Sequence, residues 1–172
     1  MTVDLKQFVR DIPDFPKPGI LFRDIAPLLA DCRALSAAID ALAAPFEGEQ
    51  VDVIAAAEAR GFIFAVPLAM RLGAGFVPIR KPGKLPFETH SHSYDLEYGS
   101  DELQIHTDAV QPGQRVIVLD DLLATGGTMK ACCALLERCG AEIVACSFLI
   151  HLAALRGETK LEPYRIESVL VY

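Results

Sequence analysis

A pair of adjacent carboxylates stands directly before a segment rich in glycine and threonine. The order over residues 120–128 is Asp-Asp-Leu-Leu-Ala-Thr-Gly-Gly-Thr. Unpaired backbone amides at the start of a helix bind anions with the help of the helix dipole, and glycine lets a backbone approach a phosphate closely. Threonine hydroxyls supply further donors. This pattern predicts a phosphate site, and its expected contacts are Ala124, Thr125, Gly126, Gly127 and Thr128.

The two acids separate this segment from the phosphate loop of nucleoside triphosphatases. No lysine follows the glycines, so the usual clamp on the outer phosphates is missing. Carboxylates repel phosphate but accept hydrogen bonds from sugar hydroxyls. We therefore expect a phosphomonoester on the loop and a ribose diol over Asp120 and Asp121. The alternative, an ordinary strand–turn–helix connection with a threonine cap, accounts for a bare Gly-Gly-Thr but poorly for the whole arrangement over 116–128.

A buried strand must deliver the acids, and a helix must begin at the glycines. The apolar run at 115–119 predicts that strand, and residues 126–139 carry apolar side chains at helical spacing. Further strands are expected at 51–57, 75–79, 142–152 and 168–172, and helices at 1–10, 33–46 and 62–72. Strands that are apolar throughout and alternate with helices indicate an α/β fold. The expected architecture is a single domain with a mainly parallel twisted sheet flanked by helices.

The stretch 81–108 interrupts this alternation and is mostly polar. Its segments 94–98 and 103–107 are expected to pair as a β-hairpin. An insertion of this kind in a compact domain is usually functional, and a flexible hairpin hood is suited to excluding water from a reaction. His90 and His92 lie inside it, and we expect them to be exposed hood residues rather than metal ligands.

A basic cluster stands beside this insertion in an otherwise acidic chain. It consists of Arg80, Lys81 and Lys84, which alone would indicate a solvated surface. The phosphate loop, however, already predicts a polyanion, and guanidinium and ammonium groups both bind phosphates. We therefore expect these cations, together with Arg60 after the strand at 51–57, to be phosphate ligands.

The bulk composition limits the partners and the compartment. The chain has 172 residues and a formal net charge of −7, so one domain over 1–172 is expected, and attraction to nucleic acid or anionic membrane is not. No apolar run predicts a membrane span or a signal peptide. Five cysteines without a Cys-x-x-Cys pair suggest neither a disulfide framework nor a zinc site, and we expect buried thiols in a reducing cytoplasm.

Four segments resemble the type I phosphoribosyltransferases, and residues 120–128 are similar in particular to the adenine-specific members of that family. The other three are the N-terminal segment 15–25, the pyrophosphate loop 58–62, and the hood residues 80–86 with 94–99. The resemblance covers nearly the whole chain and implies the fold expected above. It also implies transfer of the 5-phosphoribosyl group from 5-phosphoribosyl 1-diphosphate to adenine, which yields AMP and pyrophosphate in purine salvage.

The resemblance assigns roles in holding the diphosphate. Arg60 is implied to bind the pyrophosphate, and Arg80 and Lys84 to reach it from a loop, Arg80 from a neighbouring subunit of a homodimer. Mg²⁺ is implied as a cofactor that is carried by the diphosphate rather than by protein ligands.

The base has its own implied contacts. Glu97 is the candidate catalytic group that would face N7 of adenine, although the residue alone is equally consistent with a solvated glutamate. Phe22, which alone would more often be a core residue, and Leu122 are expected to cover the two faces of the purine. The backbone of Leu21 and Arg23 is implied to read its edge.

Two other functions stay open. One is a regulator that binds phosphoribosyl diphosphate without catalysis, but such proteins add a DNA-binding domain, and the chain offers no basic helix for DNA. The other is a phosphoribosyltransferase for a 6-oxopurine or orotate, against which the hood and N-terminal segments argue. We expect a cytoplasmic adenine-specific enzyme.

Overall fold

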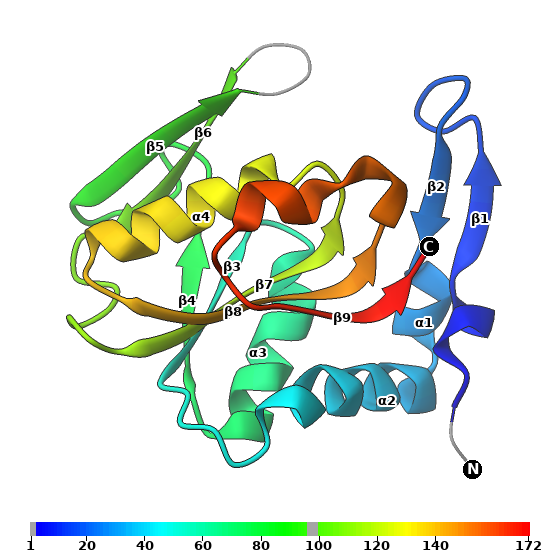
Figure 1. The fold of residues 1–172 in the computed structure, drawn as a ribbon, viewed down its shortest axis with the longest axis horizontal. Coiled ribbons are helices and arrows are strands. Elements are labelled where there is room, and N and C mark those ends of the chain that lie inside the picture. Colours follow the sequence, from blue (N-terminus) through cyan, green and yellow to red (C-terminus); the bar gives the residue numbers. More distant parts are fainter. Residues whose placement is uncertain (1–2, 96–99) are drawn as a thin grey trace.

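Five parallel strands form the central sheet of the protein (Figure 1). The computed structural model describes residues 3–95 and 100–172. In spatial order the strands are β4 (Gly75–Ile79), β3 (Val53–Ala57), β7 (Arg115–Leu123), β8 (Glu142–His151) and β9 (Ile166–Val171). All neighbouring pairs run parallel. This confirms the α/β fold with a mainly parallel sheet.

Helices cover both faces of this sheet. On one face lie α2 (Cys32–Ala43) and α3 (Gly61–Leu72), and on the other lies α4 (Gly127–Arg138) (Figure 1). The shorter elements are α1 (Ala26–Ala30) and the 3₁₀ turns η1 (Leu5–Phe8), η2 (Ala44–Phe46), η3 (Ala153–Leu155) and η4 (Gly157–Leu161). None of the helices in the described ranges is both long and apolar enough to cross a bilayer.

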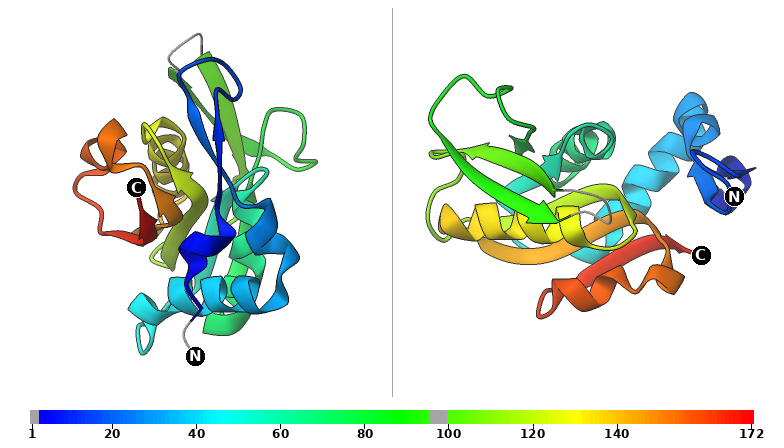
Figure 2. Two further views of the ribbon diagram at one scale, coloured as in Figure 1. Left: turned by 90° about the vertical axis from the view of Figure 1, so that its right-hand side faces the viewer. Right: turned by 90° about the horizontal axis from the view of Figure 1, so that it is seen from above.

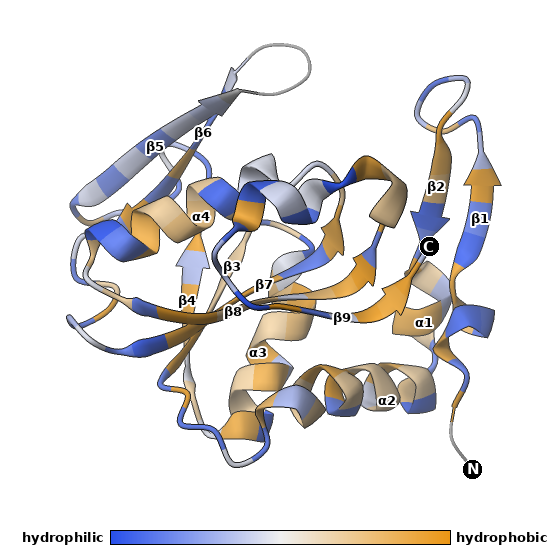
Figure 3. Ribbon diagram, viewed as in Figure 1, coloured by the Kyte–Doolittle hydropathy of each residue, from blue (hydrophilic) through white to orange (hydrophobic). Residues whose placement is uncertain are grey.

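The hydrophobic core is divided in two by the sheet. On β3, Ile54 and Ala56 belong to the cluster beneath α2 and α3, whereas Val53 and Ala55 belong to the cluster beneath α4. This follows from the alternation of side chains along a strand. The hydrophobic colours in Figure 3 accordingly concentrate in the sheet and in α3, while β5 (Thr89–Asp95) is neutral to hydrophilic. The sheet is therefore packed on both faces.

The strand order reverses between β3 and β7. The chain passes from β3 through α3 to β4 on one side, and β7 then pairs with the other side of β3. In open α/β sheets, ligands bind beyond the carboxyl ends of the strands at such a reversal. The loops that begin there carry residues 58–60 and 124–126, which are the segments expected to bind phosphates.

Two antiparallel hairpins rise on the same side of the molecule. One pairs β1 (Arg10–Pro13) with β2 (Leu21–Asp24), and the other pairs β5 with β6 (Ser100–His106). Figures 1 and 2 show them standing at opposite ends of the sheet, so that the carboxyl end of β7 lies between them. A hood hairpin is thus present, but Leu103 to His106 pair with residues 89–92 rather than with 94–98. Tyr94 lies opposite Asp101, and residues 96–98 of the predicted pairing lie outside the described residues.

Several boundaries differ from those expected. Strand β7 continues to Leu123 because its pairing with β8 extends that far, so the two acids lie within the strand rather than after it. Of the helix expected over residues 1–10, the described part from residue 3 onward contains only η1, and the chain turns into β1 at Arg10. Both hood strands begin earlier than expected, β5 at Thr89 rather than at Tyr94 and β6 at Ser100 rather than at Leu103.

Two expectations about burial were wrong. Four of the five cysteines are buried as expected, but Cys32, the first residue of α2, is exposed. His90 and His92 are partly buried on β5 rather than exposed, because they lie opposite Ile105 and Leu103 of β6.

Candidate active site

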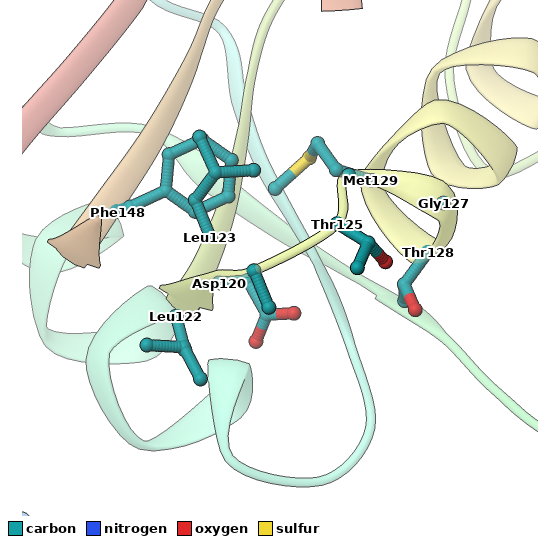
Figure 4. A pocket seen from close by; sticks show the side chains of 10 residues that line it. Asp120, Leu122, Leu123, Thr125, Gly127, Thr128, Met129 and Phe148 are labelled. Carbon is teal, nitrogen blue, oxygen red and sulfur yellow. The ribbon is translucent and has the colours of Figure 1, made fainter. Parts of the chain in front are cut away.

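The turn between β7 and α4 forms the predicted phosphate site. Gly126 has a positive φ of 78°, which lets the chain leave the strand and enter the helix. No side chain in the described ranges caps this helix, so the amides of its first turn stay open to an anion. They border a cavity of about 80 Å³, the phosphate cavity, and Figure 4 shows Asp120, Thr125 and Thr128 among the residues around it.

A second glycine, Gly157, packs against this turn from another part of the chain. A Cβ built on Gly157, in η4, would lie 2.2 Å from the carbonyl oxygen of Ala124. One built on Gly126 would lie 2.4 Å from the carbonyl oxygen of Gly157. Since nonbonded atoms do not approach so closely, neither position accepts a side chain without a shift of the backbone. Backbone packing therefore fixes the shape of the phosphate site.

The paired acids lie at the carboxyl end of β7. Asp121 is only 5% exposed, and its Oδ2 lies 2.9 Å from Nε of Arg60. Asp120 accepts a hydrogen bond of 2.9 Å from the backbone N–H of Asp121. Burial, followed by the charge of Asp121, raises the pKa of Asp120 to about 8, and burial raises the pKa of Asp121 against the opposing charge of Arg60. The pair therefore retains a proton near neutral pH and offers a sugar hydroxyl both a donor and acceptors.

Cations and acids share a second cavity, of about 270 Å³, which we call the charged cavity. Its lining residues are Glu58, Ala59, Arg60, Lys81, Tyr94, Asp101, Leu103, Asp120, Asp121 and Thr128. Two of the four cations expected to bind phosphates, Arg60 and Lys81, are among them. Arg60 pairs with Asp121, and Lys81 pairs with Asp101 on β6. The site is thus built from charges that already have partners within the chain.

Arg80 and Lys84 lie outside the lining of this cavity. Arg80 donates through Nη2 to Oε2 of Glu58 at 3.2 Å, and its backbone pairs with Gln104. Lys84 is exposed. The backbone hydrogen bond from Lys81, opposed by burial, lowers the pKa of Glu58, and Arg80 and Lys84 lower it further. In this structure both cations thus act on Glu58, and their contact with a diphosphate stays a prediction.

A third, mostly apolar cavity of about 540 Å³ lies against the N-terminal hairpin; we call it the apolar cavity. Its lining residues are Gly19, Ile20, Leu21, Arg23, Thr125, Leu152, Ala154, Leu155 and Tyr172. The guanidinium carbon of Arg23 lies 3.9 Å from the ring centroid of Tyr172, which fixes β2 against the end of the chain. Two of the residues expected to read a base, Leu21 and Arg23, therefore border a space suited to an apolar ring.

Phe22 and Leu122 take other positions. Phe22 packs edge-on against Phe15, and the guanidinium carbon of Arg60 lies 5.6 Å from its ring centroid. Leu122 lines the phosphate cavity. The predicted covering of both purine faces by these two side chains thus stays a prediction.

The three cavities meet around the β7–α4 turn. Thr125 lines both the phosphate cavity and the apolar cavity. Asp120 and Thr128 line both the phosphate cavity and the charged cavity. A single ligand on the turn therefore reaches a cationic region on one side and an apolar region on the other.

Some site residues were missed in the sequence. Gly157, Leu155 and Tyr172 lie far from the phosphate segment along the chain, and no local pattern distinguishes them. Asp101 was part of a polar insertion, which was the only signal available for it. Glu97, the predicted catalytic residue, lies outside the described residues, and its role stays a prediction.

Comparison with known proteins gives one consistent family. A family model for the phosphoribosyl transferase domain matches residues 22–170. The chain is 69% identical to the adenine phosphoribosyltransferase of Rhodopirellula baltica over 99% of this chain and 82% of that protein. The crystal structure of the adenine phosphoribosyltransferase from Thermoanaerobacter pseudethanolicus is 54% identical, with a TM-score of 0.95 and 98% of each chain covered. The enzyme from Saccharomyces cerevisiae, in complex with an imino-altritol bisphosphate and adenine, is 38% identical, with a TM-score of 0.92 and 96% of each chain covered.

These relatives are all adenine phosphoribosyltransferases, matched over 82–98% of their own lengths, and the fold of the two solved structures matches the one described above. The chain belongs to the phosphoribosyltransferase family, among the adenine phosphoribosyltransferases.

Proposed function

We propose that this enzyme joins adenine to the 5-phosphoribosyl group of 5-phosphoribosyl 1-diphosphate, forming AMP and pyrophosphate in purine salvage. The observation that carries the proposal is the meeting of three cavities of different chemistry at one turn. An anion site, a cation-containing site and an apolar site match the 5′-phosphate, the diphosphate and the base. The yeast relative, whose structure contains a bisphosphate together with adenine, supports this assignment.

The phosphate cavity would hold the sugar through its 5′-phosphate. The amides at the start of α4 and the hydroxyls of Thr125 and Thr128 supply the donors. Asp120 and Asp121 then face the ribose hydroxyls. Because displacement at the anomeric carbon builds positive charge on the sugar ring, the nearby acids also stabilise the transition state, and most of the catalysis is positioning.

The charged cavity would take the diphosphate. Arg60 offers a planar guanidinium to phosphate oxygens, and Lys81 offers a point charge, so both neutralise the departing group. Magnesium, when bound, would supply further neutralisation. Within the described ranges no three His, Cys, Asp or Glu side chains are grouped as metal ligands. We propose that Mg²⁺ is carried by the diphosphate, whose oxygens together with water would supply most of its ligands.

The apolar cavity would receive adenine. Its wall contains Leu21, Leu152 and Leu155, and the backbone of β2 supplies polar groups at its edge. Backbone groups that accept from the 6-amino group would be left unpaired by a 6-oxopurine, which gives specificity. Glu97 is proposed to face N7 of the base and to take part in its proton transfer.

We also propose that the enzyme is a cytoplasmic homodimer. Ile63, Val66 and Met70 recur at helical spacing on α3 and are all exposed, Met70 to 79%. Such a stripe is typical of a surface that a second copy covers. The buried free thiols fit a reducing compartment. Sedimentation analysis of the purified chain measures the oligomeric state directly.

A panel of bases tests the proposed reaction. The enzyme is incubated with phosphoribosyl diphosphate, Mg²⁺ and one of adenine, hypoxanthine, guanine, xanthine or orotate, and released pyrophosphate is measured. We expect product with adenine and at least ~100-fold less with the others. Product from hypoxanthine but not from adenine would overturn the specificity. Tight binding of phosphoribosyl diphosphate without product from any base would favour a regulator.

A further inference from the structure

Two carboxylates of the charged cavity, Glu58 and Asp101, have no place in the proposed reaction, and Asp101 is the one that pairs with a cation lining the cavity. Asp101 lies on β6 of the hood hairpin, opposite Tyr94, and lines the cavity together with Arg60 and Lys81. Its Oδ2 forms an ion pair with Nζ of Lys81. A negative charge in a space intended for a diphosphate opposes binding, so its presence there requires an explanation.

The contacts of Asp101 connect three parts of the site. Its Oδ2 accepts a hydrogen bond of 3.1 Å from the hydroxyl of Tyr94, and its Oδ1 accepts one of 2.8 Å from the backbone N–H of Glu102. The hydroxyl of Thr128, in the phosphate cavity, donates to the Tyr94 hydroxyl at 3.4 Å. Asp101 thus links the hood to the Lys81 loop directly and to the start of α4 through Tyr94.

Both members of the ion pair stay charged. The hydrogen bond from Lys81, against burial, lowers the pKa of Asp101. Burial works to lower the pKa of Lys81, but its contacts with Asp101 and Tyr94 together outweigh this effect and leave the pKa raised. The side chains of Asp101 and Lys81 are 26% and 40% exposed, respectively, so a ligand that enters the cavity has access to the ammonium group.

We propose that Asp101 is a positioning residue that holds Lys81 inside the charged cavity before the diphosphate binds and competes with pyrophosphate for the Lys81 ammonium, thereby weakening the binding of this product. The inference rests on the proposed function, because it takes the charged cavity to be the diphosphate site. When the diphosphate binds, the Lys81 ammonium exchanges a carboxylate for phosphate oxygens. When pyrophosphate leaves, the Lys81 ammonium pairs with Asp101 again, so that its charge does not have to be solvated without a counter-ion.

The variant Asp101→Asn tests the charge while preserving the shape. Its amide oxygen still accepts the hydrogen bond from the backbone N–H of Glu102, and its NH2 group, in the place of Oδ2, donates to the hydroxyl oxygen of Tyr94, but it no longer pairs with an ammonium. We expect pyrophosphate, titrated calorimetrically with MgCl₂, to bind ~3- to 10-fold more tightly, as the loss of a partly exposed ion pair allows. KM for phosphoribosyl diphosphate should fall by a similar factor and kcat should not rise. A merely structural role would instead raise KM.

Two further variants make the test specific. Glu102→Gln removes the same charge one residue away, where the side chain accepts from Gln104 and does not line the cavity, and it should change pyrophosphate affinity less than ~2-fold. In a Lys81→Met background, Asp101→Asn should bring no gain in pyrophosphate affinity, because the competition is for Lys81.

Wild-type enzyme that binds no pyrophosphate contradicts the proposed function and this inference with it. Wild-type binding that Asp101→Asn leaves unchanged or weakens overturns this inference alone, as does a gain that persists in the Lys81→Met background.

Discussion

The phosphate cavity and the charged cavity adjoin each other but are built in different ways. The phosphate cavity depends on backbone: open amides at the start of α4 and a turn held by the contact of Gly126 with Gly157. The charged cavity depends on side chains, and its two cations, Arg60 and Lys81, are each paired with an acid. One site is fixed by packing, and the other is an arrangement of exchangeable ion pairs.

This difference matches what each site must do in the proposed reaction. The 5′-phosphate is present in the substrate and in AMP, so its site can stay in one shape throughout. The diphosphate binds and then departs as pyrophosphate, so its ligands must release it. Preorganised donors favour the first task, because they need no rearrangement at the moment of reaction. Side chains with alternative partners favour the second.

The largest effect is expected when the packed turn is disturbed. Gly126→Ala combines a positive φ with a Cβ 2.4 Å from the carbonyl oxygen of Gly157, so the turn has to move. Because small displacements of a positioned substrate are costly, we expect kcat/KM for phosphoribosyl diphosphate to fall by roughly 10³-fold. Steady-state kinetics and AMP binding measure this loss.

Gly113→Ala is the matched control for that variant. Gly113 also has a positive φ, of 82°, but a Cβ there meets no atom within 4 Å. It should lose ~1–2 kcal/mol of stability through backbone strain and keep its kinetics. Equal kinetic losses in both variants would show that strain, and not the contact with Gly157, is responsible.

A smaller effect is expected in the charged cavity. Arg60→Lys keeps a positive charge near Asp121 but loses the planar fork, so we expect KM for phosphoribosyl diphosphate to rise ~30-fold. Arg71→Lys is the same change in the last turn of α3, whose N-cap is Arg60, and its guanidinium pairs with exposed acids, so it should have less than a ~2-fold effect. If the two variants behave alike, Arg60 is not a ligand of the diphosphate.

The smallest effect concerns Asp120, which borders both cavities. Its pKa in the folded protein is about 8, against an ordinary value of 3.8. Between these values the folded protein keeps a proton that the unfolded chain has lost. The stabilising effect of this proton is therefore complete below about pH 4 and is lost as pH rises to about 8.

Asp120→Asn should remove this dependence of the free energy of unfolding on pH because an amide does not ionise. The variant is expected to match the wild type near pH 4 and to be ~1–2 kcal/mol more stable at pH 8, since coupling to Asp121 leaves only part of the full shift. Denaturant unfolding of the ligand-free protein at several pH values measures the difference. Parallel pH profiles for the two proteins would contradict the raised pKa.

The phosphate cavity was more predictable from sequence than the charged cavity, for a physical reason. Its amides, glycines and threonines are consecutive, and a buried strand followed by a helix is a local pattern. The contact with Gly157 was not predictable, because it depends on how η4 returns to the turn. The reach of β7 to Leu123 likewise depends on its pairing with β8, which no local property encodes.

The charged cavity depends on contacts between distant segments. The sequence indicated which cations were available, but not that Lys81 pairs with Asp101 or that Arg80 turns to Glu58. Those pairs follow from the register of the hood hairpin and from the strand order of the sheet. The resemblance to a family supplied the reaction, whereas the partners of each charge required the structure.

The most direct test of the account is a crystal structure of this chain with AMP. The account predicts the phosphate within about 3 Å of the amides at residues 125–128, the ribose hydroxyls on Asp120 and Asp121, and the purine in the cavity bordered by Leu21 and Leu155. A phosphate bound among Arg60 and Lys81 instead, with the β7–α4 turn making no contact to the nucleotide, would contradict it.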